Sequence, residues 1–240
     1  YVDVLNLNAT ILGDDGNTYV VTASKEILTP KETIELTIEE ANMVWDADEM
    51  VSVLTAKNDQ MELSLTYAAS WATGPFSMLD VFLEESSVKY NGVALELESL
   101  DMLVTATKSE AGAVGYQVEL TLVSSEPIQY NVSMFAQLPV EDTVEIVLEN
   151  LEIDESYAMD GGWIFLYGSN DEWDLQSGIY DWEIMEGTYA GEEEVMFYLS
   201  NMVTDHFTEQ VYAELTVTND PEKGWVIDIV SHCTDNVVYK

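Results

Sequence analysis

The sequence contains no arginine and only seven lysines, against 46 aspartates and glutamates, which gives a formal net charge of −39. Such a surface repels phosphate backbones and anionic membranes, and without arginine there is no guanidinium fork to bind phosphate. The composition therefore argues against nucleic-acid binding and nucleotide chemistry. The acids fall at alternate strand positions and in turns, as expected for a solvated sheet face. Adaptation to a halophilic habitat is an alternative explanation for the high content of acids.

Cysteine and long apolar runs are also scarce. The one cysteine, Cys233, cannot form a disulfide within the chain. No apolar run reaches the roughly 18 residues of a transmembrane helix, and no signal peptide is present. A secreted or surface-attached precursor fits, with its leader and tether outside a sequence that begins at Tyr1. We expect an extracellular or cell-surface location, with membrane contact only through that missing tether.

Hydrophobic residues, in contrast, make up 47% of the chain and aromatic residues 10%, which is ample for packed cores. Short runs of alternating apolar and polar residues, separated by Asn, Asp and Gly turns, predict antiparallel sheets with one solvated face. Helical periodicity is nearly absent. The expected fold class is all-β, with antiparallel β-sandwich or small β-barrel domains.

One stretch occurs twice. Gly115-Tyr116-Gln-Val-Glu-Leu and Gly224-Trp225-Val-Ile-Asp-Ile share their pattern, and each leads to a tyrosine, Tyr130 or Tyr239. The two glycines are 109 positions apart in the sequence, and so are the two tyrosines. Other landmarks keep the same order with shifts between 109 and 113; they pair 32–38 with 142–148, 51–54 with 163–166, Asn58 with Asn170, 74–76 with 187–189, and Leu103 with Leu215.

This order predicts two tandem domains, at 31–140 and 141–240, related by internal duplication. Residues 1–30 precede them. There, alternating residues flank the turn signal Gly13–Asn17, so we expect an N-terminal β-hairpin. The hairpin is either a partial repeat or a pair of added strands. Such a strand pair at one end could complete the sheet of a neighbouring molecule.

The sequence resembles tandem domains of secreted or lipid-anchored surface proteins of Bacteroidales bacteria. The resemblance rests on the order of an acid-Thr-aliphatic strand, an Asn-Asp turn between strands, Gly-x-aromatic, and an alternating hairpin that ends in tyrosine. Some of these proteins have calycin-like β-barrels. The resemblance implies a surface lipoprotein without catalytic residues, although no lipobox cysteine is present.

Catalytic groups are sparse. The only histidines are His206 and His232, and His232 precedes Cys233. Adjacent side chains on a strand point to opposite faces, so His232 and Cys233 are not expected to form a nucleophilic pair. The carboxylates are too numerous to identify a hydrolytic pair by spacing. We expect no enzymatic activity, and a secreted hydrolase is the last-ranked alternative.

Calcium is the one cofactor that the acids suggest. Asp46 with Asp48, and Asp171 with Asp174, cluster oxygen ligands in predicted turns, and Ca²⁺ prefers six to eight such oxygens. Neither cluster matches an EF-hand loop, and Asn and Asp are ordinary turn formers. The competing expectation is no cofactor at all.

Four aromatic residues are candidate ligand contacts because they fall outside the best-matched strands: Trp71, Trp173, Tyr180 and Trp182. Exposed Tyr and Trp rings beside carboxylates suit stacking on sugar rings or a protein hot spot. Core packing is the favoured competing interpretation. Trp163 and Trp225 are expected in the core, because they occupy matched strand positions.

The leading functional hypothesis is a non-enzymatic extracellular or cell-surface module that binds a glycan or a protein, or that spaces another module from the cell. The alternative is a structural subunit of a surface filament, which self-associates by strand addition through residues 2–23.

Overall fold

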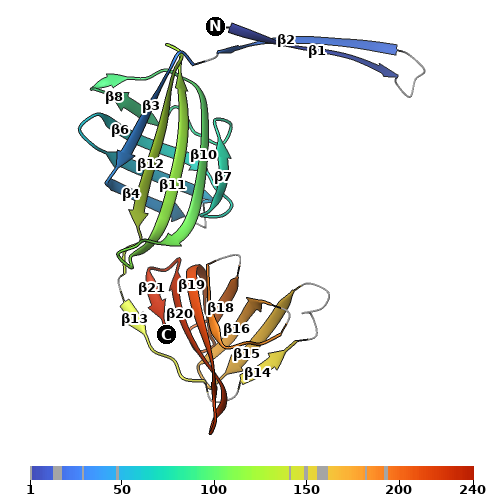
Figure 1. Ribbon diagram of the computed structural model, residues 1–240, viewed down its shortest axis with the longest axis vertical. Helices are drawn as coiled ribbons and strands as arrows, with labels where there is room; N and C mark the ends of the chain where they lie inside the picture. Colours follow the sequence, from blue (N-terminus) through green and yellow to red (C-terminus); the bar gives the residue numbers. More distant parts are fainter. Residues whose placement is uncertain are drawn as a thin grey trace.

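The computed structural model describes residues 2–12, 18–28, 30–46, 49–140, 142–148, 151–155, 162–181, 183–191 and 194–240. These residues form twenty-one strands and no helix, which confirms the prediction of an all-β fold. Accordingly, none of the described segments is a helix long and apolar enough to cross a membrane. The strands form an N-terminal hairpin and two further groups, which we call domain 1 (31–140) and domain 2 (141–240) after the bounds expected from the sequence (Figure 1).

The N-terminal hairpin consists of β1 (Val2–Leu12) and β2 (Thr18–Leu28), paired along their whole length from Val2 opposite Leu28 to Leu12 opposite Thr18. It forms a sheet of two strands that extends away from domain 1 (Figure 1). The predicted turn at Gly13–Asn17 lies outside the described residues.

Domain 1 contains two five-stranded sheets. The first has the order β3 (Glu32–Ile38), β12 (Ile128–Gln137), β11 (Val114–Ser124), β10 (Leu97–Lys108) and β7 (Gly74–Ser77). The second has the order β4 (Glu40–Asp46), β5 (Val51–Lys57), β6 (Met61–Ala68), β8 (Ser87–Tyr90) and β9 (Val93–Ala94). Strand alternation directs one face of each sheet inward, so residues of both sheets, such as Leu54 and Val118, share one buried cluster.

Domain 2 forms one nine-stranded sheet. Its strands are β13 (Asp142–Val144), β14 (Leu151–Asp154), β15 (Trp163–Ser169), β16 (Trp173–Tyr180), β17 (Gly187–Ala190), β18 (Val195–Asn201), β19 (His206–Asp220), β20 (Gly224–Cys233) and β21 (Val237–Tyr239). The sheet is continuous because β19 pairs with β18 near its start and with β20 thereafter. In domain 1 the equivalent stretch is divided into two strands, β9 and β10, which belong to different sheets.

The two domains have the same strand order and register. Ala106 lies opposite Tyr116 on β10 and β11, and Asn219 lies opposite Trp225 on β19 and β20. The first pair of strands has an irregularity between Leu97 and Ser99, and the second has one at the equivalent place, between Gln210 and Tyr212. Each domain also has one parallel pair, β3 with β12 and β13 with β21, within otherwise antiparallel sheets. These matches support the internal duplication, which stays a prediction.

One matched landmark was wrong by one residue. Leu103 was paired with Leu215, but Leu103 is 50% exposed and Leu215 is fully buried. The registers with β7 and β17 make Met102 the counterpart of Leu215, since Met102 lies opposite Phe76 and Leu215 opposite Tyr189. A shift of one residue moves a strand side chain to the opposite face, which explains the difference in burial.

The Asn-Asp turns are built alike in both domains. Asn58 Oδ1 accepts hydrogen bonds from the Gln60 and Met61 amides, and Asn58 Nδ2 donates to the Thr37 carbonyl at 3.1 Å. Asn170 Oδ1 likewise accepts from the amides of Glu172 and Trp173. Each asparagine therefore closes a turn and ties it to a segment more than twenty positions away in sequence.

Replacing Asn58 tests this structural role. Asn58→Ala removes three hydrogen bonds and should lower the free energy of unfolding of domain 1 by about 1–2 kcal/mol. Urea denaturation followed by circular dichroism measures the change. The neighbouring exposed Asp59→Ala is the matched control and should leave the midpoint unaltered; equal effects of the two substitutions would contradict this account of the turn.

Candidate functional site

The candidate site depends on how domain 2 is anchored to domain 1. The irregularity in β19 places Val211 and Tyr212 against the domain 1 core, with 2% and 8% of their surfaces exposed. The equivalent residue of domain 1, Glu98, is exposed, so this use of the bulge is particular to domain 2. Lys108 Nζ also donates to Glu214 Oε2 at 2.5 Å, which raises the lysine pKa.

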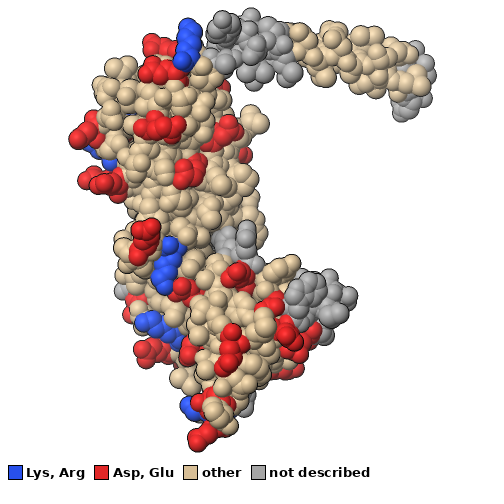
Figure 2. Space-filling view, viewed as in Figure 1, with Lys and Arg blue, Asp and Glu red and all other residues tan. Residues whose placement is uncertain are grey.

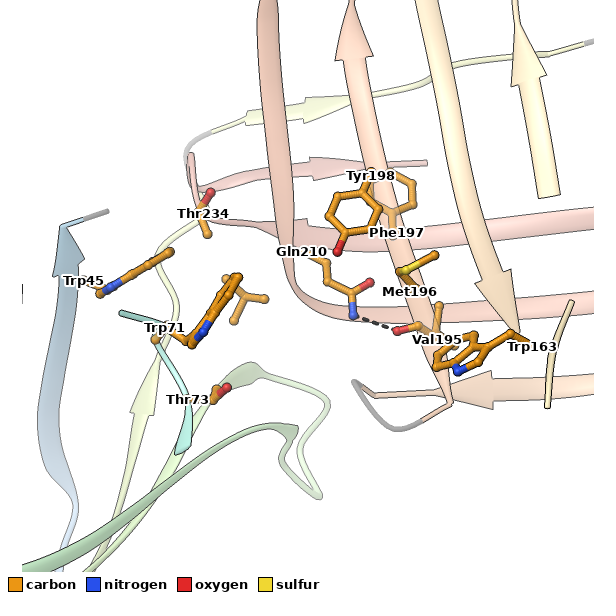
Figure 3. Close-up of a pocket in the computed structure, with 12 residues that line it drawn as sticks. Trp45, Trp71, Thr73, Trp163, Val195, Met196, Phe197, Tyr198, Gln210 and Thr234 are labelled. Atoms are coloured by element: carbon orange, nitrogen blue, oxygen red, sulfur yellow. Dashed lines mark hydrogen bonds between the residues drawn. The ribbon is translucent and has the colours of Figure 1, made fainter. Parts of the chain in front are cut away.

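A cleft of about 430 Å³ lies beside this contact and is lined by both domains (Figure 3). Domain 1 contributes the end of β4 and the segment between β6 and β7; domain 2 contributes β15, β18, β19 and the turn before β21. Its described lining residues carry no charge. They are Trp45, Trp71, Ala72, Thr73, Trp163, Val195, Met196, Phe197, Tyr198, Gln210, Val211 and Thr234.

The three tryptophans of the cleft are held to different degrees. Trp45 is half-buried, and its Nε1 donates to the Ala69 carbonyl at 3.1 Å, which fixes the ring. Trp163 is half-buried and meets Tyr180 edge-on, with ring centroids 5.5 Å apart. Trp71 is 67% exposed and lies at the domain 1 side of the cleft (Figure 3). Two rings are therefore fixed by the fold, and the third presents most of its surface to solvent.

Gln210 supplies a polar group among these rings. Its Nε2 donates to the Val195 carbonyl at 2.8 Å (Figure 3). Its Oε1 is buried and accepts no hydrogen bond from the described residues. A buried acceptor without a partner raises the free energy of the unoccupied site, so a ligand hydroxyl that donates to it would bind more tightly.

The aromatic candidates from the sequence have different positions. Trp71 lines the cleft, and Tyr180 is 53% exposed next to Trp163. Trp173 instead packs on the domain 2 core, with its ring 5.9 Å from that of Tyr239. Trp182 lies outside the described residues.

The prediction that Trp163 and Trp225 are core residues was wrong. Trp163 belongs to the outward-facing positions of β15, whose inward neighbours Ile164 and Leu166 are fully buried. Trp225 is 37% exposed because the β19–β20 hairpin extends past the rest of domain 2 (Figure 1). The sequence did not single out Trp45, Tyr198 or Gln210, because no local pattern shows that distant strands meet at a domain boundary.

The calcium candidates show turn and strand roles. Asp46 Oδ1 accepts a hydrogen bond from the Glu49 amide at 3.0 Å, as a turn residue does. Asp171 is exposed in the turn that Asn170 closes, and Asp174 is exposed on β16. Asp48 lies outside the described residues. Among the described positions, no three His, Cys, Asp or Glu side chains are grouped to hold a metal ion, and calcium stays a prediction.

The cysteine and histidines have structural surroundings. Cys233 is 1% exposed, and burial raises the pKa of its thiol to about 11. Burial also lowers the pKa of the neighbouring His232. His206 Nε2 lies 3.1 Å from Asp235 Oδ2, which accepts a hydrogen bond from the Tyr239 hydroxyl at 2.8 Å. A buried, protonated thiol is a poor nucleophile. The expectation that the chain has no enzymatic activity stays a prediction.

No protein-family model, curated protein or solved structure matches this chain. The resemblance to surface proteins of Bacteroidales therefore stays a prediction.

The thiol of Cys233 provides a test of these surroundings. Because its raised pKa keeps it protonated and the core covers it, native protein at pH 8 should react with a disulfide reagent far more slowly than an exposed thiol. In guanidinium the same reagent should titrate one thiol per chain, as the single cysteine requires. Rapid stoichiometric reaction of the native protein would contradict the burial of Cys233.

Proposed function

We propose that this chain is a non-enzymatic binding module of the cell surface or extracellular space, whose inter-domain cleft takes an uncharged glycan. The observation that carries the proposal is an aromatic cleft without charged lining residues, among those described, in a chain of net charge −39. Acids lie over both domains outside it (Figure 2).

The chemistry of the lining favours a sugar over other small ligands. Indole rings offer flat apolar faces for stacking, and the Gln210 carbonyl oxygen suits a hydroxyl donor. The surrounding negative field repels phosphate, nucleotide and carboxylate ligands. The volume of about 430 Å³ falls in the usual range of small-molecule sites. The extracellular location rests on the sequence alone.

A second function, self-association into a filament, is favoured by the N-terminal hairpin. Leu7, Ala9 and Ile11 of β1 share one face with Tyr19 and Val21 of β2. These side chains are exposed apart from Ala9, and Leu7 and Ile11 are 55% and 52% exposed.

The charge distribution also favours the hairpin as a contact between copies. Its described side chains, at 6–12 and 18–24, include no acid or lysine, and this stretch is correspondingly bare of charge in Figure 2. Two chains of net charge −39 repel one another, so they approach best through such a segment. An isolated two-stranded sheet is marginal in water and gains stability by pairing.

Trp71→Ala tests the cleft. Loss of the most exposed ring should weaken the binding of neutral oligosaccharides about tenfold, or about 1.4 kcal/mol, measured by calorimetry across a panel of soluble glycans. Leu79→Ala is the matched control, because Leu79 is 95% exposed on domain 1 and does not line the cleft. A panel in which wild-type protein binds no neutral glycan would end the proposal.

The filament alternative is tested by charging one face of the hairpin. Leu7→Lys with Val21→Lys should abolish concentration-dependent association in light scattering, because both side chains lie on the apolar face. Asn8→Lys with Thr22→Lys introduces the same charge on the opposite face and should retain association. Wild-type protein that stays monomeric at all accessible concentrations rules this alternative out.

A further inference from the structure

The outward face of the domain 2 sheet carries a set of aromatic side chains beyond the cleft. We call it the aromatic face, and it consists of Trp163, Phe165, Tyr167, Tyr180, Tyr198 and Phe207. The residues alternate with buried ones along their strands, so all six point away from the domain 2 core. They span β15, β16, β18 and β19, a width of about 14 Å at the usual strand spacing.

The rings of this face contact one another and remain partly open to solvent. Trp163 meets Tyr180 edge-on, Phe165 stacks with Tyr167 at 6.3 Å, and Tyr198 stacks with Phe207 at 6.0 Å. Tyr180, Tyr198 and Phe207 are 53%, 38% and 54% exposed. The pairs restrict ring motion, so a flat ligand would lose little side-chain freedom on binding.

Two glycines make room for these rings. A Cβ on Gly178 would lie 3.1 Å from Trp163 Cε3 and 3.5 Å from Phe165 Cδ1. A Cβ on Gly162, whose φ is +74°, would lie 2.8 Å from Tyr180 Cε2. The backbone at both positions is therefore shaped to let the rings lie against it.

Domain 1 shows that the fold does not require aromatic residues on this face. With the same registers, the six counterparts are all non-aromatic. They are Val51, Val53, Thr55, Ala68, Ser87 and Ala94. The rings are thus a property of domain 2 and not of the shared architecture.

We propose that the aromatic face binds an extended, uncharged polysaccharide chain that continues out of the cleft. This inference rests on the proposed function, and it assigns a polymer, where the cleft alone would accept a short sugar. The cleft and the face share Trp163 and Tyr198, so the two surfaces are continuous. Glu152 lies across from Tyr167, and Asp154 across from Phe165. These carboxylates accept hydrogen bonds from sugar hydroxyls and repel acidic polymers.

The experiment compares chain lengths and variants of the whole protein. The probes are soluble neutral glucans, mannans and xylans together with their disaccharides and hexasaccharides, measured by calorimetry and affinity electrophoresis. The face variant combines Phe165→Val, Tyr167→Thr and Phe207→Ala, which are the residues that domain 1 carries at these positions. Val53→Ala with Thr55→Ala is the matched control on domain 1. If the melting temperature shows that the triple variant does not fold, the single variant Phe207→Ala is measured in its place.

We expect wild-type affinity to rise with chain length, and the face variant to lose at least about tenfold for the polymer and less than about twofold for the disaccharide. Phe207→Ala should lose about threefold for the polymer. Binding that depends on Trp71 but not on chain length would overturn this inference and leave the proposed function standing. Polymer binding that is unaffected by the face variant would also overturn it. If wild-type protein binds no probe, both proposals fail.

Discussion

Strand β19 and its one irregularity determine most of what is particular to this molecule. Its first residues pair with β18 and the rest with β20, so the two halves of domain 2 become one sheet. The irregularity at the start of the pairing with β20, between Gln210 and Tyr212, places Val211 against the domain 1 core. Without the irregularity, the alternation of side chains along β19 would shift by one residue, and Val211 would point to the opposite face of the sheet. The position of the domains, and hence the cleft between them, depends on this contact.

The two domains provide an internal comparison, because they share registers but differ on their outer faces. Inward positions are mostly apolar in both, as core packing requires, and buried serines such as Ser52 and Ser177 are among the exceptions. Outward positions are under no such requirement, and there domain 1 has Val53 and Thr55 where domain 2 has Phe165 and Tyr167. The difference is one of the observations behind the proposed binding role. The net charge of −39 fits an uncharged partner for these surfaces.

The sequence predicted the features that are encoded locally. Alternation identified the strands, asparagines marked equivalent turns, and the spacing of Tyr130 and Tyr239 located the closing strand of each domain. An error of one position in matching the two domains reverses the predicted inward or outward direction of a strand side chain, as it did for Leu103. The sequence also could not find the cleft, since Trp45, Trp71 and Trp163 come together only through tertiary contacts. Trp173, a candidate by sequence, proved to be packed on the core.

The most direct test of the central claim is a titration of the indole N–H resonances with neutral oligosaccharides, observed by ¹H–¹⁵N correlation spectroscopy. The six tryptophans provide probes both inside and outside the cleft. The account predicts progressive shifts for Trp71 and Trp163, with Trp173 and Trp225 unchanged because they lie away from the cleft. Spectra that do not change with any neutral glycan, or that change only at Trp173 and Trp225, would contradict it.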